Sequence, residues 1–150
     1  MQRNAVRALL TVTLLLCALT RADAVPMVRL VTDGVDVTVA DGGVGDASSA
    51  SGVVLFNGSL GDWLINITSG FSKPALGSAA TPMLDLNSAN LSSSGGGAID
   101  IWLTDTDFAA IPTAANVLAA IGGTTSGTVS YRTFYDASNT PFGTAKAQRA

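Results

Sequence analysis

Apolar and polar residues alternate over residues 35–40, where Val35, Val37 and Val39 are separated by polar or small residues. A period of two is typical of a β-strand that buries one face and exposes the other. An Asp-Gly dipeptide lies on either side of this segment, and such dipeptides favour turns. The pattern therefore predicts a half-buried strand bounded by two turns.

A short apolar run at residues 53–56 predicts a second strand. Asn57-Gly58 follows it directly and is a strong turn signal. Trp63, Ile65 and Ile67 then fall on one face of a third segment with a period of two. We therefore expect a hairpin here, with Trp63 in the core.

Alternation returns at Leu84 and Leu86 but slips near Ser88 before the apolar residue Leu91. One extra residue in a strand shifts the side-chain pattern in this way. The slip predicts a β-bulge inside a strand that spans residues 84–91.

Residues 99–104 carry the next clear alternation, with Ile99, Ile101 and Leu103 on one face. Asp100, Trp102 and Thr104 lie on the opposite face. This arrangement predicts a strand whose isoleucine and leucine side chains point into the core.

Residues 113–121 fit two patterns. Their apolar positions fit a helical stripe capped by Gly122, and they fit a strand face equally well. A strand is favoured because the segment 129–135 beyond the glycine-rich loop is rich in β-forming residues. No structure is predicted beyond Pro141, and residues 143–150 are expected to form a flexible tail.

Several short strands with glycine-rich turns, and no long amphipathic helix, predict an all-β fold. An antiparallel β-sandwich or jelly roll fits this pattern. We expect one such domain over residues 25–142, a length at which a single core is feasible.

The first 24 residues have the features of a secretory signal peptide. Arg3 and Arg7 precede an apolar stretch at residues 8–19, and Ala22-Asp23-Ala24 supplies a small-x-small cleavage pattern. Cleavage is expected after Ala24. The apolar stretch is shorter than the roughly 20 residues of a membrane-spanning helix, and no membrane span is expected in the mature chain.

Composition narrows the chemistry of residues 25–150, which contain no His, Glu or Cys. Those side chains carry most nucleophilic, acid–base and zinc chemistry. Ten Asp residues face five Lys or Arg, which gives the mature chain a net charge of about −5. The cations form no basic patch, so nucleic acid is not an expected partner.

Five stretches occur together in a recognisable order. They are 32–46 (TDGVDVTVADGGVGD), 52–70 (GVVLFNGSLGDWLINITSG), 84–91 (LDLNSANL), 103–108 (LTDTDF) and 121–136 (IGGTTSGTVSYRTFYD). In this order the chain resembles, over roughly residues 28–142, a group of bacterial exported proteins that often end in a PEP-CTERM sorting tail.

That group is associated with surface-attached, exopolysaccharide-producing bacteria and biofilms, and most of its members have no assigned activity. The resemblance implies an envelope or extracellular-matrix protein, and it transfers no catalytic residue. The Pro-Glu-Pro tail itself is absent from this sequence. Two alternatives stay open, a chain that normally continues into an anchor and a protein that is released.

Two acidic segments are candidates for calcium, which prefers carboxylate and carbonyl oxygens. The segment 42–46 is similar to one unit of a glycine-Asp calcium repeat, but a tight turn is favoured because the unit occurs once. Asp105 and Asp107 follow the strand that carries Asp100. A solvated strand end with an Asx-type turn is favoured over a metal site there.

Trp102 and Asp100 are the candidate ligand-binding residues. If only one face of the sheet is buried, Trp102 is exposed beside Asp100 and Thr104. Exposed aromatic rings beside carboxylates can stack on sugar rings and bind their hydroxyls. The alternative, which is favoured, is that a loop such as 70–82 covers Trp102 or that both sheet faces are covered.

Enzyme hypotheses have little support in the sequence. A nucleophilic Ser lacks a His partner, and a Ser-Lys pair would require Lys73 or Lys146, both in predicted loops. Two Asp residues would suffice for an Asp-dependent hydrolase, the remote alternative. We therefore expect that the protein is not an enzyme and uses no cofactor, and that it has a structural or adhesive role at the cell surface. Its expected partners are extracellular polysaccharide or other surface proteins. The main alternative is a carbohydrate-binding module that uses Trp102.

Overall fold

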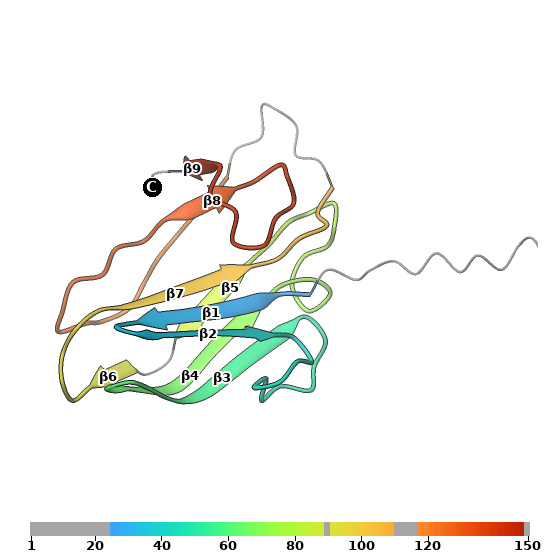
Figure 1. The fold of residues 1–150 in the computed structure, drawn as a ribbon. Helices are drawn as coiled ribbons and strands as arrows, with labels where there is room; N and C mark the ends of the chain where they lie inside the picture. Colours follow the sequence, from blue (N-terminus) through green and yellow to red (C-terminus); the bar gives the residue numbers. More distant parts are fainter. Residues whose placement is uncertain (1–24, 89–90, 110–116, 149–150) are drawn as a thin grey trace, which may run out of the picture.

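The computed structural model describes residues 25–88, 91–109 and 117–148, which form nine β-strands (Figure 1). The strands are β1 (Met27–Thr32), β2 (Val35–Ala40), β3 (Val53–Leu60), β4 (Trp63–Phe71), β5 (Asp85–Ser88), β6 (Leu91–Ser93), β7 (Ile99–Thr104), β8 (Thr133–Tyr135) and β9 (Lys146–Gln148). The described residues contain no helix, and so none that could span a membrane. The all-β prediction is confirmed for this part of the chain. The segment predicted as a signal peptide, 1–24, lies outside the described residues.

The first sheet has the order β2-β1-β7, and both strand pairs are antiparallel. Leu30 on the central strand β1 lies opposite Val37 on β2 and Ile101 on β7. The two clearest alternating segments of the sequence are therefore the two edge strands of this sheet. Ile101 packs against the core together with its neighbours Ile99 and Leu103, which confirms the predicted inward face of β7.

The second sheet has the order β3-β4-β5, with β6 also paired to β4. β3 continues through Asn57-Gly58, where the sequence predicts a turn, and that prediction is wrong. The pairing register shifts between Phe56 and Gly58, so the dipeptide is accommodated as an irregularity within the strand. The chain reverses instead at Gly61, whose φ of 56° suits a residue without a β-carbon.

The predicted strand at residues 84–91 is divided into β5 and β6. Ser88 pairs with Thr68 and Leu91 with Ile65, so the two strands follow each other along β4. Residues 89–90, next to the position where the sequence pattern slips, lie outside the described residues, and the predicted bulge stays a prediction. Leu86 is exposed although it was expected on an apolar face, because it lies on β5 at the edge of the sheet.

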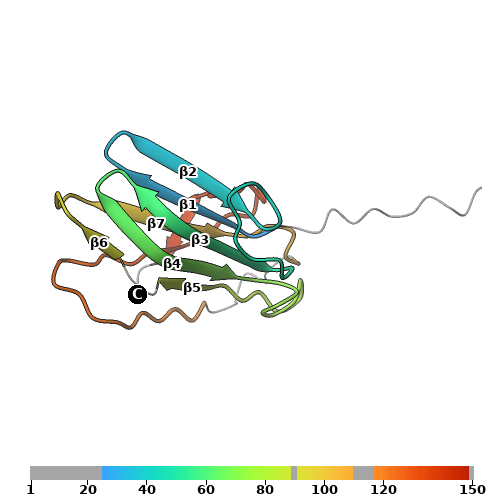
Figure 2. The ribbon, with the colours of Figure 1, turned by 90° about the horizontal axis from the view of Figure 1, so that it is seen from below.

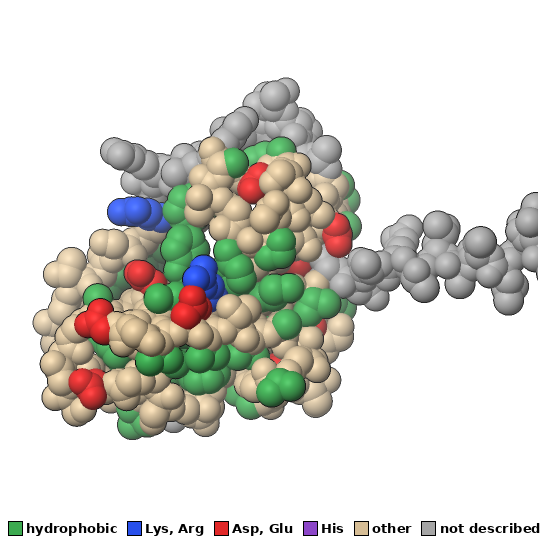
Figure 3. All heavy atoms as spheres, viewed as in Figure 1, with side chains coloured by type: hydrophobic (Ala, Val, Ile, Leu, Met, Phe, Trp, Pro, Cys, Tyr) green, Lys and Arg blue, Asp and Glu red, His purple; other side chains and the backbone are tan. Residues whose placement is uncertain are grey.

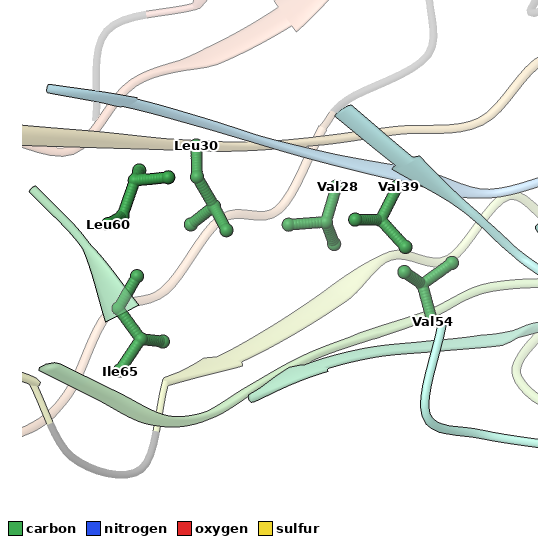
Figure 4. Packing of buried hydrophobic residues seen from close by; sticks show 6 residues of the cluster. All are labelled: Val28, Leu30, Val39, Val54, Leu60 and Ile65. Carbon is green, nitrogen blue, oxygen red and sulfur yellow. The ribbon is translucent and has the colours of Figure 1, made fainter. Parts of the chain in front are cut away.

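The core lies between these two sheets. It is formed by buried aliphatic side chains from both sheets, namely Val28, Leu30, Val39, Val54, Leu60 and Ile65. In Figure 2 the strands of the second sheet run alongside those of the first, and in Figure 4 the six side chains meet in the space between them. Burying such side chains is the main favourable contribution to folding in a chain without disulfides.

The C-terminal third differs most from expectation. Residues 117–121 form no strand, so the strand prediction is wrong there, and residues 113–116 lie outside the described part. Of the predicted strand 129–135, only β8 is formed. β9 pairs with β8, with Phe134 opposite Ala147, in a segment where the sequence predicts no structure.

Candidate functional site

Trp102 lies on the outer face of β7, opposite the core, but it is not bare. Its ring stacks on Phe134 of β8, with 5.8 Å between the ring centroids and 19° between the planes. Trp102 is half-buried, whereas Asp100 two residues earlier is exposed. Of the two alternatives in the sequence, the structure places Trp102 under a cover, which Phe134 of β8 provides. A ligand-binding role for Trp102 and Asp100 stays a prediction.

The chain after β8 extends this cover over the first sheet. The backbone N–H of Phe142 donates to Thr104 Oγ1 at 3.1 Å, and the Phe142 ring lies 6.0 Å from the guanidinium carbon of Arg29. Arg29 Nε also donates to Asp36 Oδ1 at 2.9 Å. This hydrogen bond is the main reason that the pKa of Asp36 lies below its usual value.

Replacing Phe134 with alanine should uncover Trp102. Removing the stacked ring is expected to cost about 0.5–1.5 kcal/mol for the aromatic pair alone. Acrylamide should then quench Trp102 fluorescence more strongly, measured in a Trp63→Phe background so that Trp102 is the single reporter. Unchanged quenching would show that Phe134 does not shield Trp102.

The side chain of Asp105 is fully buried and is already bound by groups of its own chain. Its Oδ2 accepts hydrogen bonds from Lys73 Nζ at 2.8 Å and from Ser72 Oγ, while the Thr106 N–H donates to Oδ1 at 2.7 Å. The Lys73 ammonium also lies 3.9 Å from the centre of the Phe108 ring. The carboxylate thus has a cation as its partner, and a positive metal ion would compete with that ammonium.

Asp107 faces a different partner. Its backbone N–H donates to Asn139 Oδ1 at 2.7 Å, and Asn139 Nδ2 donates to Asp107 Oδ1. Asp107 has a φ of 57°, which turns the chain after β7. The two calcium candidates Asp105 and Asp107 therefore bind separate groups. Within the described ranges, no three Asp or Cys side chains gather as metal ligands would.

The glycine-Asp segment 42–46 forms a turn organised by one carboxylate. Asp46 accepts hydrogen bonds from the backbone N–H groups of Gly42, Ser48 and Leu55, at 2.8, 2.9 and 2.9 Å. These bonds satisfy the polar backbone of a loop between β2 and β3, as an Asx-type residue does. The turn that the sequence favours for this segment is present.

Ser72 and Lys73 are the Ser-Lys pair that the structure brings to one carboxylate. Both bind Asp105, but Ser72 is fully buried, with 0% of its surface exposed. A nucleophile must reach the substrate carbonyl, and Ser72 cannot do so in this arrangement. The three side chains join the start of the loop after β4 to the end of β7. The side chain of Lys146 is not among those described.

A cleft that the sequence did not indicate lies at one end of the two sheets. It has a volume of about 200 Å³. Three connections line it, the turns β1–β2 and β3–β4 and the loop β6–β7, through Thr32, Asp33, Gly61, Asp62, Trp63, Gly96 and Gly97. Trp63, expected in the core, packs against the core and also lines this cleft.

A second hollow, of about 290 Å³, lies beside the loop between β2 and β3 and is lined by Asp41, Gly42 and three serines. It has no aromatic side chain, and the Asp41 carboxylate is bound by the Gly52 N–H at 2.6 Å. The cleft at Trp63 is therefore the better candidate for a binding site.

Charged side chains on the face seen in Figure 3 are scattered, and the basic ones are isolated from each other. The ion pairs of the described residues join Arg29 to Asp36 and Lys73 to Asp105.

No protein-family model, no curated protein and no solved structure matches this chain.

Proposed function

We propose that this chain is an exported β-sandwich that serves as a non-catalytic surface or extracellular-matrix protein, with a structural or adhesive role. The observation that carries the proposal is the closed cluster of Ser72, Lys73 and Asp105. These residues are the described groups best placed to form an activated nucleophile, and they are buried against one another. A carboxylate and an ammonium that neutralise each other brace two loops and leave little capacity for proton transfer.

The fold supports the same proposal. Two antiparallel sheets share one core, and the outer face of the first sheet carries an additional cover from β8. Such a layered arrangement is typical of sandwich domains on cell surfaces. The N-terminal sequence features and the resemblance to exported matrix-associated proteins agree with a location outside the cytoplasm.

The experiment is to express the full chain in a cell with a working export pathway and to fractionate the culture. We expect a protein that begins at Val25 in the surface or matrix fraction, retained there at physiological salt. An intact Met1 on protein recovered from the cytoplasm would overturn the export part of the proposal.

The non-catalytic part is tested separately with the exported protein. Incubation with neutral and acidic polysaccharides should release no reducing ends above the background of a heat-unfolded sample. Release that disappears in an Asp→Asn variant would show instead that the chain is an Asp-dependent hydrolase.

A further inference from the structure

The cleft at Trp63 is held open by contacts within its own walls. Thr32 Oγ1 donates to the Ala98 carbonyl at 3.0 Å and the Ser94 N–H donates to the Asp62 carbonyl at 3.2 Å. Ser93 Oγ donates to the Gly96 carbonyl at 2.7 Å. The three connections are thus tied together before any ligand arrives, and a pre-formed site loses less entropy on binding.

The two charged side chains that line this cleft are both aspartates, whose carboxylates accept hydrogen bonds. Asp33 and Asp62 are both exposed there, and neither takes part in the ion pairs formed by the described residues. A β-carbon at Gly95 would overlap the Asp62 carboxylate, so the glycine at this position of the β6–β7 loop leaves room for that group. Two carboxylates repel anions and favour a ligand that donates hydrogen bonds.

Trp63 gives the cleft an apolar surface that is fixed in place. The side chain is half-buried and packs against the core, so its ring has little freedom to lose when a ligand binds. A tryptophan with adjacent carboxylates can stack against the C–H groups of a sugar ring while the carboxylates accept its hydroxyl protons.

The size of the cleft limits what enters it. At about 200 Å³ it is smaller than the roughly 300–1,000 Å³ of pockets that enclose a drug-sized ligand. It is also open to solvent at the end of the sheets, as expected for residues in turns. A ligand that is a polymer could therefore place one of its units in the cleft while its remaining units stay in solvent.

We propose that this cleft binds a neutral polysaccharide, with one sugar ring on Trp63 and hydroxyl groups donating to Asp33 and Asp62. This inference rests on the proposed surface role, because a polysaccharide of this kind is met outside the cytoplasm. It moves the sugar-binding aromatic from Trp102, which is stacked on Phe134, to Trp63.

The test is affinity electrophoresis of the exported protein in native gels that contain dextran, hydroxyethylcellulose or galactomannan. We expect at least one neutral polysaccharide to retard the protein and alginate, an acidic one, to have no effect. The double variant Asp33→Asn/Asp62→Asn should weaken retardation roughly tenfold or more, since each charge-assisted hydrogen bond is strong. Both residues are exposed, so the variant should remain folded.

Trp63→Ala should weaken retardation similarly, and Trp102→Ala is the matched aromatic control that should retain it. Because Trp63 also packs against the core, Trp63→Ala can lose binding simply by unfolding. A second measurement therefore leaves Trp63 in place. In the Trp102→Phe protein, Trp63 is the single tryptophan, and the retarding polysaccharide should change its emission.

Absence of retardation by every neutral polysaccharide, or equal retardation of the double Asp variant, would overturn the inference. Retardation that requires added Ca²⁺ and is lost in EDTA would also overturn it, since the carboxylates would then bind a cation. Failure of the proposed function looks different. Protein found only in the cytoplasm would refute the surface role whether or not dextran retards the purified chain.

Discussion

Replacing Asp105 with alanine is expected to lower the free energy of unfolding by about 3–5 kcal/mol. The Asp105 side chain is completely buried, and the Lys73 side chain is 14% exposed. Removing the carboxylate would leave the ammonium without its anion, and would leave the Ser72 hydroxyl with only the more distant Met83 carbonyl, at 3.4 Å, as an acceptor. The charge-assisted bonds are lost, but most of the effect comes from the largely buried ammonium of Lys73, which would remain without a counter-charge.

Urea unfolding of the wild type and the variant, followed by circular dichroism, measures this difference. Asp100→Ala is the matched control, because Asp100 is an exposed aspartate on β7, the strand that Asp105 directly follows, and its loss should change stability by no more than about 0.5 kcal/mol. A double variant, Asp105→Leu with Lys73→Met, should recover much of the loss, since it removes both charges. If Asp105→Ala were as stable as Asp100→Ala, the buried cluster would not brace the loops.

Strands with a clean period of two could be predicted from the sequence, because that pattern is local. β2 and β7 each have apolar residues on one face and mostly polar residues on the other. β1 carries no such signal, although it is the central strand. Its outward face includes Met27 and Val31 as well as Arg29, so the alternation is hidden.

Turns were less predictable, because the same dipeptide can reverse the chain or shift a register. Asn57-Gly58 has the strongest hairpin signal in the chain, yet it lies within β3. The reversal occurs at Gly61: β3 ends at Leu60, and β4 begins at Trp63, which pairs with Leu60. Pairing along the full length of β4 outweighs the local preference of the dipeptide.

The candidate sites depended on long-range contacts that no periodicity reports. Alternation correctly placed Trp102 opposite the core, but it cannot show that Phe134 covers it. Lys73 and Asp105 are 32 residues apart and pair only once the sheets have formed. The cleft at Trp63 forms because three separate connections meet at one end of the fold. No local pattern in the sequence indicates that they meet.

Gly52→Ala is expected to destabilise the fold by about 2–5 kcal/mol, through two separate effects. Gly52 has a φ of 81°, where an alanine costs about 1–2 kcal/mol. An added β-carbon would also lie 2.8 Å from the Ala75 nitrogen and 2.8 Å from the Ser72 carbonyl oxygen. These are backbone atoms that cannot rotate away, so overpacking adds about 1–3 kcal/mol.

Gly34→Ala separates these two effects. Gly34 has a φ of 75°, close to that of Gly52, but a β-carbon there would meet no atom within 4 Å. Only the backbone cost of about 1–2 kcal/mol should appear in its urea unfolding curve. The difference in unfolding free energy between the two variants measures how closely Gly52 approaches the chain after β4. The same two segments are joined by a hydrogen bond, in which the Ser72 N–H donates to the Gly52 carbonyl at 2.9 Å. Equal destabilisation by both substitutions would mean that this loop yields to the new methyl group, and that Ser72 and its cluster are not held rigidly against the turn before β3.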